Sequence, residues 1–345
     1  MMPQSHQLAR AAINGVAVAL PEQTLSNETM TADADDRTRA LLLRHTGVLC
    51  RHIAAEGETA LDLGEAACRK LFVAHPNLAE RVDTLIFCTQ SPDYILPPNS
   101  CVLHGRLGLR DAVAAFDLPH ACSAFIYAIK LAQALIASDS AENVLVVTAD
   151  TYSKFIHPQD RSTRLLFGDG AAATWIGAAT EGRGVLDVSC GTDGKRHGKF
   201  LIPAGGTRMP VTDAVRCDEK RDPSGNLRSP AHIHMAGNDM LSFVGSHIPG
   251  HVKDLLARNA LALDAVDWLV FHQASNVVLD TLTNLLDADP AKVLRHFQSI
   301  GNTVSASIPI VLDHAIGEGI IKPGQFVLLC GFGVGLSWGS ALVRW

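Results

Sequence analysis

The stretch DLPHACSAFIYAIKLAQALIAS, residues 117–138, predicts a buried helix that opens on a cysteine. The sixteen residues after Cys122 are mostly Ala, Ile, Leu, Phe and Tyr with a single Lys, which favours a helix covered on every side. Unpaired N–H groups in its first turn favour an anion, so we expect the Cys122 thiolate to be more populated than in a free cysteine. This environment suits a nucleophile, although free cysteines also serve as small buried fillers.

The composition argues against several classes of protein. The chain has 345 residues, of which 47% are hydrophobic and 19% charged, enough for one large or two medium domains. A net charge of −6 gives no general attraction to nucleic acid or to an anionic membrane surface. No apolar run approaches the roughly 18 residues of a membrane span. We therefore expect neither a nucleic-acid partner nor a membrane partner.

The cysteines suggest the compartment. They show no C-x-x-C pair and no Cys/His ligand spacing, so we expect no metal site. Several stand inside apolar runs such as LIFCTQ and VLLCGF, which is typical of buried, reduced thiols in a cytoplasmic protein. The eight positions are Cys50, Cys68, Cys88, Cys101, Cys122, Cys190, Cys217 and Cys330.

A hidden duplication organises the chain. Three segments recur in the same order at offsets of 181 to 184 residues, and strands alternate with helices in both copies. We therefore predict an α/β fold of two similar halves, residues 1–180 and 181–345, with the Cys122 helix between two sheets. The matched segments are 81–91 with 265–275, 121–138 with 302–319, and 143–150 with 326–333.

The second half supplies two candidate partners for Cys122. His272 ends the apolar strand VDWLVF, where α/β proteins place their sites, although most of the 15 histidines must have other roles. Asn302 lies in SIGNTVSASIP before a helix of small residues, where a helix cap and a catalytic role are both open. The GFGVG turn at 331–335 either brings a backbone N–H close to a ligand or simply connects two strands.

Five motifs together resemble the β-ketoacyl-acyl carrier protein synthase III family: DLPHACSAFIYA, FGDGAAA, FHQAS, GNTVSASIP and the closing GFGVGLSWGSALVRW. The resemblance covers essentially the whole chain. It implies a thiolase-like fold, in which two βαβαβαββ halves form a five-layered α-β-α-β-α arrangement, usually as a homodimer.

The resemblance also implies a chemistry. Cys122 looks like the acyl-accepting nucleophile, His272 and Asn302 complete a triad that assists loss of CO₂ from malonyl carrier protein, and the backbone N–H groups of Cys122 and Val334 form an oxyanion hole. Acyl-CoA or acyl carrier protein delivers the primer, and no cofactor is needed. The expected enzyme is an acyltransferase that starts fatty-acid synthesis or serves a related secondary pathway.

The substrate-binding positions match the family only in part. Arg161 in DRSTR and Asn238 in MAGND match positions that contact CoA, and Leu96 stands at the gate contributed by the second subunit. Ser275, after HQA, is a further candidate for substrate binding. The departures from common family residues are Leu41, His45, Leu96, Val277 and Val334.

Basic side chains offer a surface for carriers. They are mostly solvated, yet they could also hold a phosphate-bearing thioester or an acidic carrier protein. The group comprises Arg161, Arg164, Lys195, Arg196, Lys199 and Arg208.

Three alternatives stay open. A type III polyketide synthase shares the triad and a GFG turn, but HQAS and the SWGSALVRW ending favour the synthase III family. An acyltransferase could move the acyl group of Cys122 to oxygen or nitrogen without decarboxylation. A non-catalytic subunit of a heterodimer is disfavoured by the intact triad.

Overall fold

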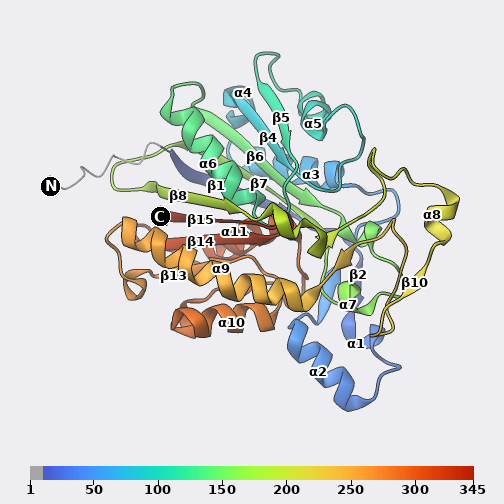
Figure 1. The fold of residues 1–345 in the computed structure, drawn as a ribbon. Coiled ribbons are helices and arrows are strands. Elements are labelled where there is room, and N and C mark those ends of the chain that lie inside the picture. The colour runs from blue at the N-terminus through green and yellow to red at the C-terminus, as the bar shows by residue number, and fades with distance from the viewer. Residues whose placement is uncertain (1–10) are drawn as a thin grey trace.

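Two sheets form the frame of the protein in the computed structural model, which describes residues 11–345. Both sheets and the helices around them are visible in Figure 1. The first sheet has the strand order β1 (Ala11–Ala19), β7 (Gly170–Ala178), β6 (Asn143–Asp150), β4 (Thr84–Cys88) and β5 (Ala114–Leu118). The second has the order β13 (Trp268–Phe271), β14 (Phe326–Gly333), β15 (Ser337–Arg344) and β8 (Gly184–Thr192).

The predicted duplication is confirmed by the strand pairing. In the first sheet β4 is parallel to β6, and β6 and β1 are both antiparallel to β7. The second sheet repeats this pattern, because β13 is parallel to β14, and β14 and β8 are both antiparallel to β15. The division proposed at residue 180 falls between β7 of one sheet and β8 of the other. The assignment of residues 1–180 and 181–345 as separate domains stays a prediction.

The second half is one strand shorter than the expected βαβαβαββ pattern. Where the first half has β5, the second has an isolated parallel bridge between Leu269 and Val293. The side chain of Gln273 occupies this edge: its Oε1 accepts the His296 N–H at 3.0 Å, and its Nε2 donates to the carbonyls of Phe271 and Leu294. The Gln273 side chain therefore adds hydrogen bonds at the end of this short backbone pairing.

Helices complete five layers. The outer layer of the first half contains α3 (Ala60–Ala74) and α5 (Asn99–Leu107), and that of the second contains α9 (Gly237–Arg258) and α10 (Asn276–Leu286). The central layer contains α6 (Ala124–Ala137) and α11 (Ser307–Gly317). As predicted, α6 packs against strands of both sheets (Figure 1). Its apolar residues and the absence of any acidic residue suit a helix buried on both faces.

The connecting segments carry shorter elements. Between β1 and α3 lie β2 (Thr24–Ser26), α1 (Asn27–Met30), α2 (Asp36–Thr46) and β3 (Cys50–His52). Between α3 and β7 lie α4 (Leu78–Arg81), the 3₁₀ helix η1 (Tyr152–Phe155) and α7 (Arg161–Arg164). Between β8 and α9 lie η2 (Gly194–Lys199), β9 (Phe200–Leu201), α8 (Asp213–Cys217), β10 (Lys220–Arg221), β11 (Leu227–Arg228) and β12 (His234–Met235). The remaining 3₁₀ turns are η3 (Leu263–Ala265), η4 (Pro290–Lys292) and η5 (Val304–Ala306).

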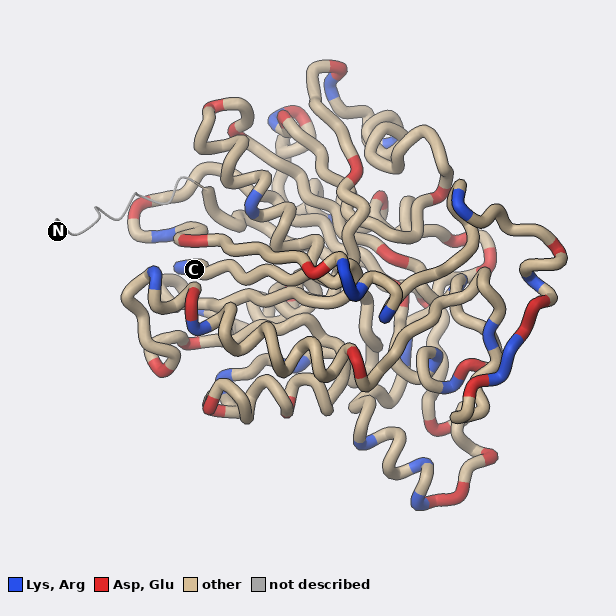
Figure 2. Tube along the Cα trace, in the orientation of Figure 1, with Lys and Arg blue, Asp and Glu red and all other residues tan. Residues whose placement is uncertain are grey.

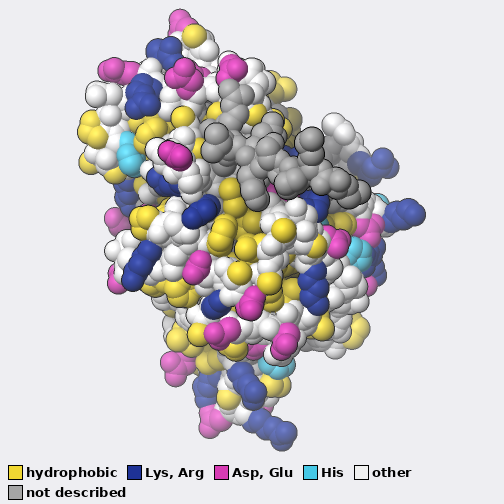
Figure 3. All heavy atoms as spheres, turned by 90° about the vertical axis from the view of Figure 1, so that its left-hand side faces the viewer, with side chains coloured by type: hydrophobic (Ala, Val, Ile, Leu, Met, Phe, Trp, Pro, Cys, Tyr) yellow, Lys and Arg dark blue, Asp and Glu magenta, His cyan; other side chains and the backbone are white. Residues whose placement is uncertain are grey.

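No helix within residues 11–345 has the length and apolar character needed to cross a bilayer. On the face shown in Figure 3, acidic and basic side chains are interspersed with apolar ones. This face therefore presents no broad patch of one charge.

Candidate active site

Cys122 directly precedes Ser123, the N-cap of α6. Its side chain is 4% exposed. It packs in an apolar cluster with Tyr152, Phe200 and Val304, which come from three separate segments of the chain. The thiol therefore lies where the central helix begins and the loops of both halves meet.

Two glycines let β14 approach this cysteine. A Cβ atom at Gly331 would lie 2.6 Å from the carbonyl oxygen of Cys122, and a Cβ atom at Gly333 would lie 3.0 Å from its Sγ. The strand β14 runs through Gly333, so the glycine-rich segment expected as a turn at 331–335 is largely strand. Its glycines provide room for the nucleophile rather than for a phosphate.

Burial reverses the acidity expected for Cys122. Desolvation raises the pKa of the thiol above its usual value, and the nearby Asp150 carboxylate raises it further. The backbone N–H groups of Cys122 and Val334 interact with the thiol and lower its pKa, but they do not compensate for burial. The expectation of an enriched thiolate is therefore wrong, because the helix terminus was considered without the apolar cluster around it.

His272 follows β13 and is 2% exposed. Its backbone N–H donates to the carbonyl of Cys330 at 2.8 Å, and its ring packs edge-on against Phe332 at 5.6 Å between centroids. Nδ1 is hydrogen-bonded to Ser307 Oγ at 2.6 Å. Burial lowers the pKa of His272 to about 3, so the ring is neutral at pH 7.

Asn302 was considered from sequence either as a helix cap or as a catalytic residue. It forms a bridge with Phe167, and its Oδ1 accepts the Val304 N–H at 3.0 Å at the start of η5. This bond forms an Asx-turn, whereas the N-cap of η5 is Thr303. No described residue binds Nδ2, which is left as a donor on the other branch of the amide.

The three predicted residues converge on one place. Cys122 and His272 contact neighbouring residues of β14, since Cys122 lies against Gly333 and His272 against Phe332. Asn302 binds Val304, which belongs to the same apolar cluster as Cys122. The site thus combines a thiol from one half with an imidazole and an amide from the other.

An apolar pocket of about 750 Å³ leads to this cluster. Tyr152, Phe200, Ile233 and Val334 line the pocket and also pack in the cluster around Cys122. The pocket is therefore large enough for an acyl chain, and part of its lining packs with Cys122.

Sequence analysis did not identify Phe200 and Ile233, which stand in a segment rich in polar residues, Gly and Pro. Both are buried in the cluster around Cys122. Ser307 and Asp150 were missed as well. Ser307 could have been noticed as the second serine in the Asn302 motif, whereas nothing local indicates that Asp150 lies near the site.

The other predicted binding residues are dispersed. Leu96 is 79% exposed, next to the pocket-lining residues Tyr94 and Ile95. Asn238 is exposed in the first turn of α9. Ser275 is the N-cap of α10, where its Oγ accepts the Val278 N–H at 3.4 Å. Its observed contact is thus a helix cap.

Arg161 lines a separate cleft of about 920 Å³. Arg164 of the same short helix and Arg221 of the β10–β11 hairpin also line it. The guanidinium of Arg161 pairs with Asp33, so part of the positive charge is already compensated. The cleft therefore presents guanidinium groups, which pair well with phosphate oxygens.

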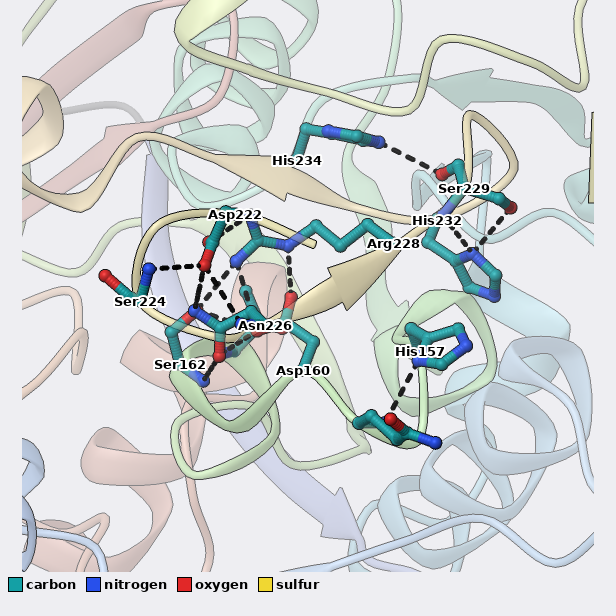
Figure 4. A network of polar contacts seen from close by, with 12 residues as sticks. His157, Asp160, Ser162, Asp222, Ser224, Asn226, Arg228, Ser229, His232 and His234 are labelled. Carbon is teal, nitrogen blue, oxygen red and sulfur yellow. Dashed lines mark hydrogen bonds and ion pairs between the residues drawn. The ribbon is translucent and has the colours of Figure 1, made fainter. Parts of the chain in front are cut away.

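An ion-pair network joins the start of α7 to the β10–β11 hairpin, two segments that line this cleft (Figure 4). Arg228 Nε donates to Asp160 Oδ2 at 2.5 Å, and its Nη1 donates to Asp222 Oδ2 at 3.1 Å. Asp160 also accepts the Ser162 hydroxyl at 2.7 Å. Asp160 is the N-cap of α7, so the network fixes the helix that carries Arg161.

The basic group predicted from sequence is partly neutralised. In addition to Arg161, Arg196 pairs with Asp193 at 2.7 Å and Lys199 pairs with Asp239 at 2.9 Å. Figure 2 shows basic and acidic positions close together along the segment between β8 and α9. This segment does not form a continuous positive surface.

These features define a class. Two related sheets enclose a central helix that begins at a buried cysteine, with a histidine and an asparagine from the other half, which is the thiolase-like arrangement of condensing enzymes. Residues 116–194 match the family model described as 3-oxoacyl-[acyl-carrier-protein (ACP)] synthase III, and residues 256–345 match the model for its C-terminal part.

Individual relatives agree along the whole chain. The β-ketoacyl-[acyl-carrier-protein] synthase III of Clostridioides difficile is 36% identical over 336 residues, which cover 97% of this chain and 98% of that protein. A crystal structure of a 3-oxoacyl-(acyl-carrier-protein) synthase III is 38% identical, with a TM-score of 0.94 and coverage of 97% of this chain and 100% of the other. The chain belongs to the 3-oxoacyl-[acyl-carrier-protein] synthase III family of condensing acyltransferases.

A polyketide enzyme has the same architecture. The structure of a priming β-ketosynthase from the R1128 polyketide biosynthetic pathway is 26% identical, with a TM-score of 0.83. The alignment covers 99% of this chain and 98% of that protein. The same fold thus occurs in an enzyme of polyketide biosynthesis.

Proposed function

We propose that the enzyme carries an acyl primer on Cys122 and condenses it with malonyl carrier protein, with release of CO₂. The observation that carries the proposal is the combined setting of Cys122. The thiol interacts with the backbone N–H groups of Cys122 and Val334 and packs against residues that line the apolar pocket. It also contacts β14, which the neutral His272 contacts as well.

Acyl transfer is the first step. The sulfur of Cys122 attacks the thioester carbonyl, the carrier leaves as a thiol with the proton from Cys122, and the primer becomes a thioester of the enzyme. The backbone N–H groups of Cys122 and Val334 stabilise the oxyanion formed at the carbonyl. One such donor typically contributes about 10²- to 10³-fold to the rate.

Decarboxylation and condensation follow. The Nε2–H of His272 and the Nδ2–H of Asn302 donate to the thioester oxygen of malonyl carrier protein, so that loss of CO₂ leaves a stabilised enolate. Its carbon then attacks the acyl carbonyl on Cys122. A C–C bond forms, the C–S bond breaks, and the β-ketoacyl carrier protein is released.

We assign the primer's carrier by chemistry. The pocket lined by Phe200 suits the acyl chain, and the arginine-lined cleft at Arg161 suits the phosphates of a CoA or phosphopantetheine carrier. Asp33 pairs with Arg161 and competes with such a phosphate. A homodimer, contact of Leu96 with the second subunit, substrate contacts of Asn238 and Ser275, a cytoplasmic location and the absence of a required cofactor belong to the same proposal.

Acylation of Cys122 tests the proposal. The wild-type protein is incubated with a panel of acyl-CoAs and acyl carrier proteins, and its intact mass is measured. We expect one acyl adduct per chain that is absent from Cys122→Ala. No adduct, or an adduct that survives this substitution, contradicts the assignment of the nucleophile.

Release of CO₂ separates the alternatives. An enzyme that acylates Cys122 but passes the acyl group to oxygen or nitrogen releases no CO₂ from malonyl carrier protein. A non-catalytic subunit performs neither step alone. The fold likeness to the priming ketosynthase favours secondary metabolism as a second candidate for the pathway, and the primers accepted distinguish the two.

A further inference from the structure

Asp150 is a fully buried carboxylate that joins the two halves beside the site. Its Oδ1 accepts the Gln90 N–H at 2.9 Å and the Thr89 hydroxyl at 3.2 Å, both from the loop after β4. Its Oδ2 accepts the Ser305 N–H at 3.2 Å and the Ser305 hydroxyl at 2.5 Å. Ser305 belongs to the turn that follows Asn302, so one side chain connects this turn to the nucleophile's half.

The turn after Asn302 is strained. Val304 has a φ of +54°, a conformation that a β-branched residue rarely adopts. Such a conformation persists only where the surrounding contacts fix it. Val304 is fixed on one side by the bond from its N–H to Asn302 Oδ1 and on the other by the bonds of Ser305 to Asp150.

The bonds to Asn302 and to Asp150 lie on either side of Val304. If Ser305 is released, Val304 can relax toward a negative φ, and its N–H then turns away from Asn302 Oδ1. The Asn302 side chain would lose the contact that directs its Nδ2 away from the turn. The orientation of this amide thus depends on a carboxylate 152 residues earlier in the chain.

We propose that Asp150 is a positioning residue, which holds the Asn302 amide through Ser305 in the orientation that decarboxylation requires. This inference rests on the proposed role of Asn302 in stabilising the enolate. Asp150 itself contacts neither thioester. Loss of the bond between Ser305 and Asp150 should therefore affect CO₂ release. Acylation of Cys122 depends instead on the backbone N–H groups of Cys122 and Val334, which this bond does not position.

The Ser305→Ala variant removes the hydroxyl bond and keeps the backbone bond to Asp150. We expect kcat for CO₂ release from malonyl carrier protein to fall roughly tenfold, since the lost bond is to a charged group. The rate of Cys122 acylation and the KM for the primer should stay at their wild-type values. A general loss of structure would lower both half-reactions.

Ser91→Ala is the matched control. Ser91 is also a buried serine, and its hydroxyl donates at 3.4 Å to Oδ1 of the same carboxylate, the oxygen that does not bind Ser305. We expect wild-type CO₂ release from this variant. Asp150→Asn is a second variant that keeps the size of the side chain, and it should likewise slow CO₂ release more than acylation.

Wild-type CO₂ release by Ser305→Ala, or equal losses in Ser305→Ala and Ser91→Ala, overturns the positioning role. Thermal unfolding of each variant shows that the comparison is made on folded protein. A wild-type enzyme that neither acylates Cys122 nor releases CO₂ contradicts the proposed function instead. The two failures are therefore distinguishable.

Discussion

His272 Nδ1 and Ser307 Oγ are hydrogen-bonded at 2.6 Å. The Ser307 oxygen also accepts the Gln273 N–H at 3.4 Å. When the Ser307 hydroxyl donates to Nδ1, Nε2 carries the ring proton, as donation to a thioester oxygen requires. Ser307 thus holds the orientation of the His272 ring and, as a donor, sets its tautomer.

Replacing Ser307 with Ala should therefore impair the histidine without removing it. We expect CO₂ release from malonyl carrier protein to fall about tenfold, the effect of one lost hydrogen bond together with a misaligned ring. Ser100→Ala is the control, because Ser100 is buried and its Oγ has no partner among the described residues. Equal activities of the two variants would show that Ser307 does not position His272.

The low pKa of His272 predicts an acid-sensitive fold. An unfolded histidine titrates near 6.5, whereas burial lowers the pKa of His272 to about 3. The unfolded state therefore binds the extra proton as the pH falls from about 6.5 toward about 3, and stability falls with it. Above pH 6.5 the ring is neutral in both states and contributes no pH dependence.

Urea unfolding at pH 7 and pH 4.5 measures this effect. The wild-type free energy of unfolding should fall by about 2 to 3 kcal/mol more than that of His272→Gln. Burial raises the pKa of Asp150 to about 6, so its protonation favours the folded state as the pH falls. Because Asp150 is present in both proteins, its contribution cancels from the difference between them. Parallel pH profiles would contradict a buried, neutral His272.

Asp150 should also restrain the reactivity of Cys122. Burial raises the pKa of the Cys122 thiol, and the Asp150 carboxylate is the second cause of this rise. Replacing Asp150 with Asn removes the second cause, so alkylation of Cys122 by iodoacetamide should become severalfold faster at pH 8 and its pH profile should move to lower pH. Peptide mass spectrometry assigns the label among the eight cysteines. An unchanged profile in folded protein would show that the carboxylate has no influence on the thiol.

The architecture was accessible from sequence because it repeats. The segments around Phe87, Val147 and Ile129 have counterparts near offset 183, and apolar runs of strand and helix length leave few arrangements for two such halves. The motifs then located Cys122 and His272 at the ends of elements. Local pattern was sufficient for these features.

Burial and long-range contacts could not be predicted from local sequence patterns. The acidity of Cys122 depends on an apolar cluster that includes Phe200, and the orientation of Asn302 depends on Asp150, a residue of another strand. No local pattern links these positions. An isolated bridge at Val293 stands in place of the expected strand, and no local pattern indicates it.

Primer length should depend on Phe200. Its ring lines the pocket and packs edge-on against Tyr152 at 6.5 Å between centroids. Phe200→Leu removes part of the wall, so the longest acyl-CoA or acyl carrier protein that acylates Cys122 should become longer. Phe243→Leu, in a separate apolar cluster with α9 and α10, should lose stability without changing the preference. An unchanged preference in Phe200→Leu would place the acyl chain elsewhere.

Gly333 should be needed for chemistry more than for folding. Its backbone is extended, but a Cβ atom there would lie 3.0 Å from both Cβ and Sγ of Cys122. Gly333→Ala should therefore displace the thiol, lower the rate of Cys122 acylation by more than about tenfold and cost roughly 1 to 3 kcal/mol of stability. Gly105→Ala is the control, since its added methyl in α5 meets nothing within 4 Å. Wild-type acylation by Gly333→Ala, measured by intact mass, would show that the thiol does not need this space.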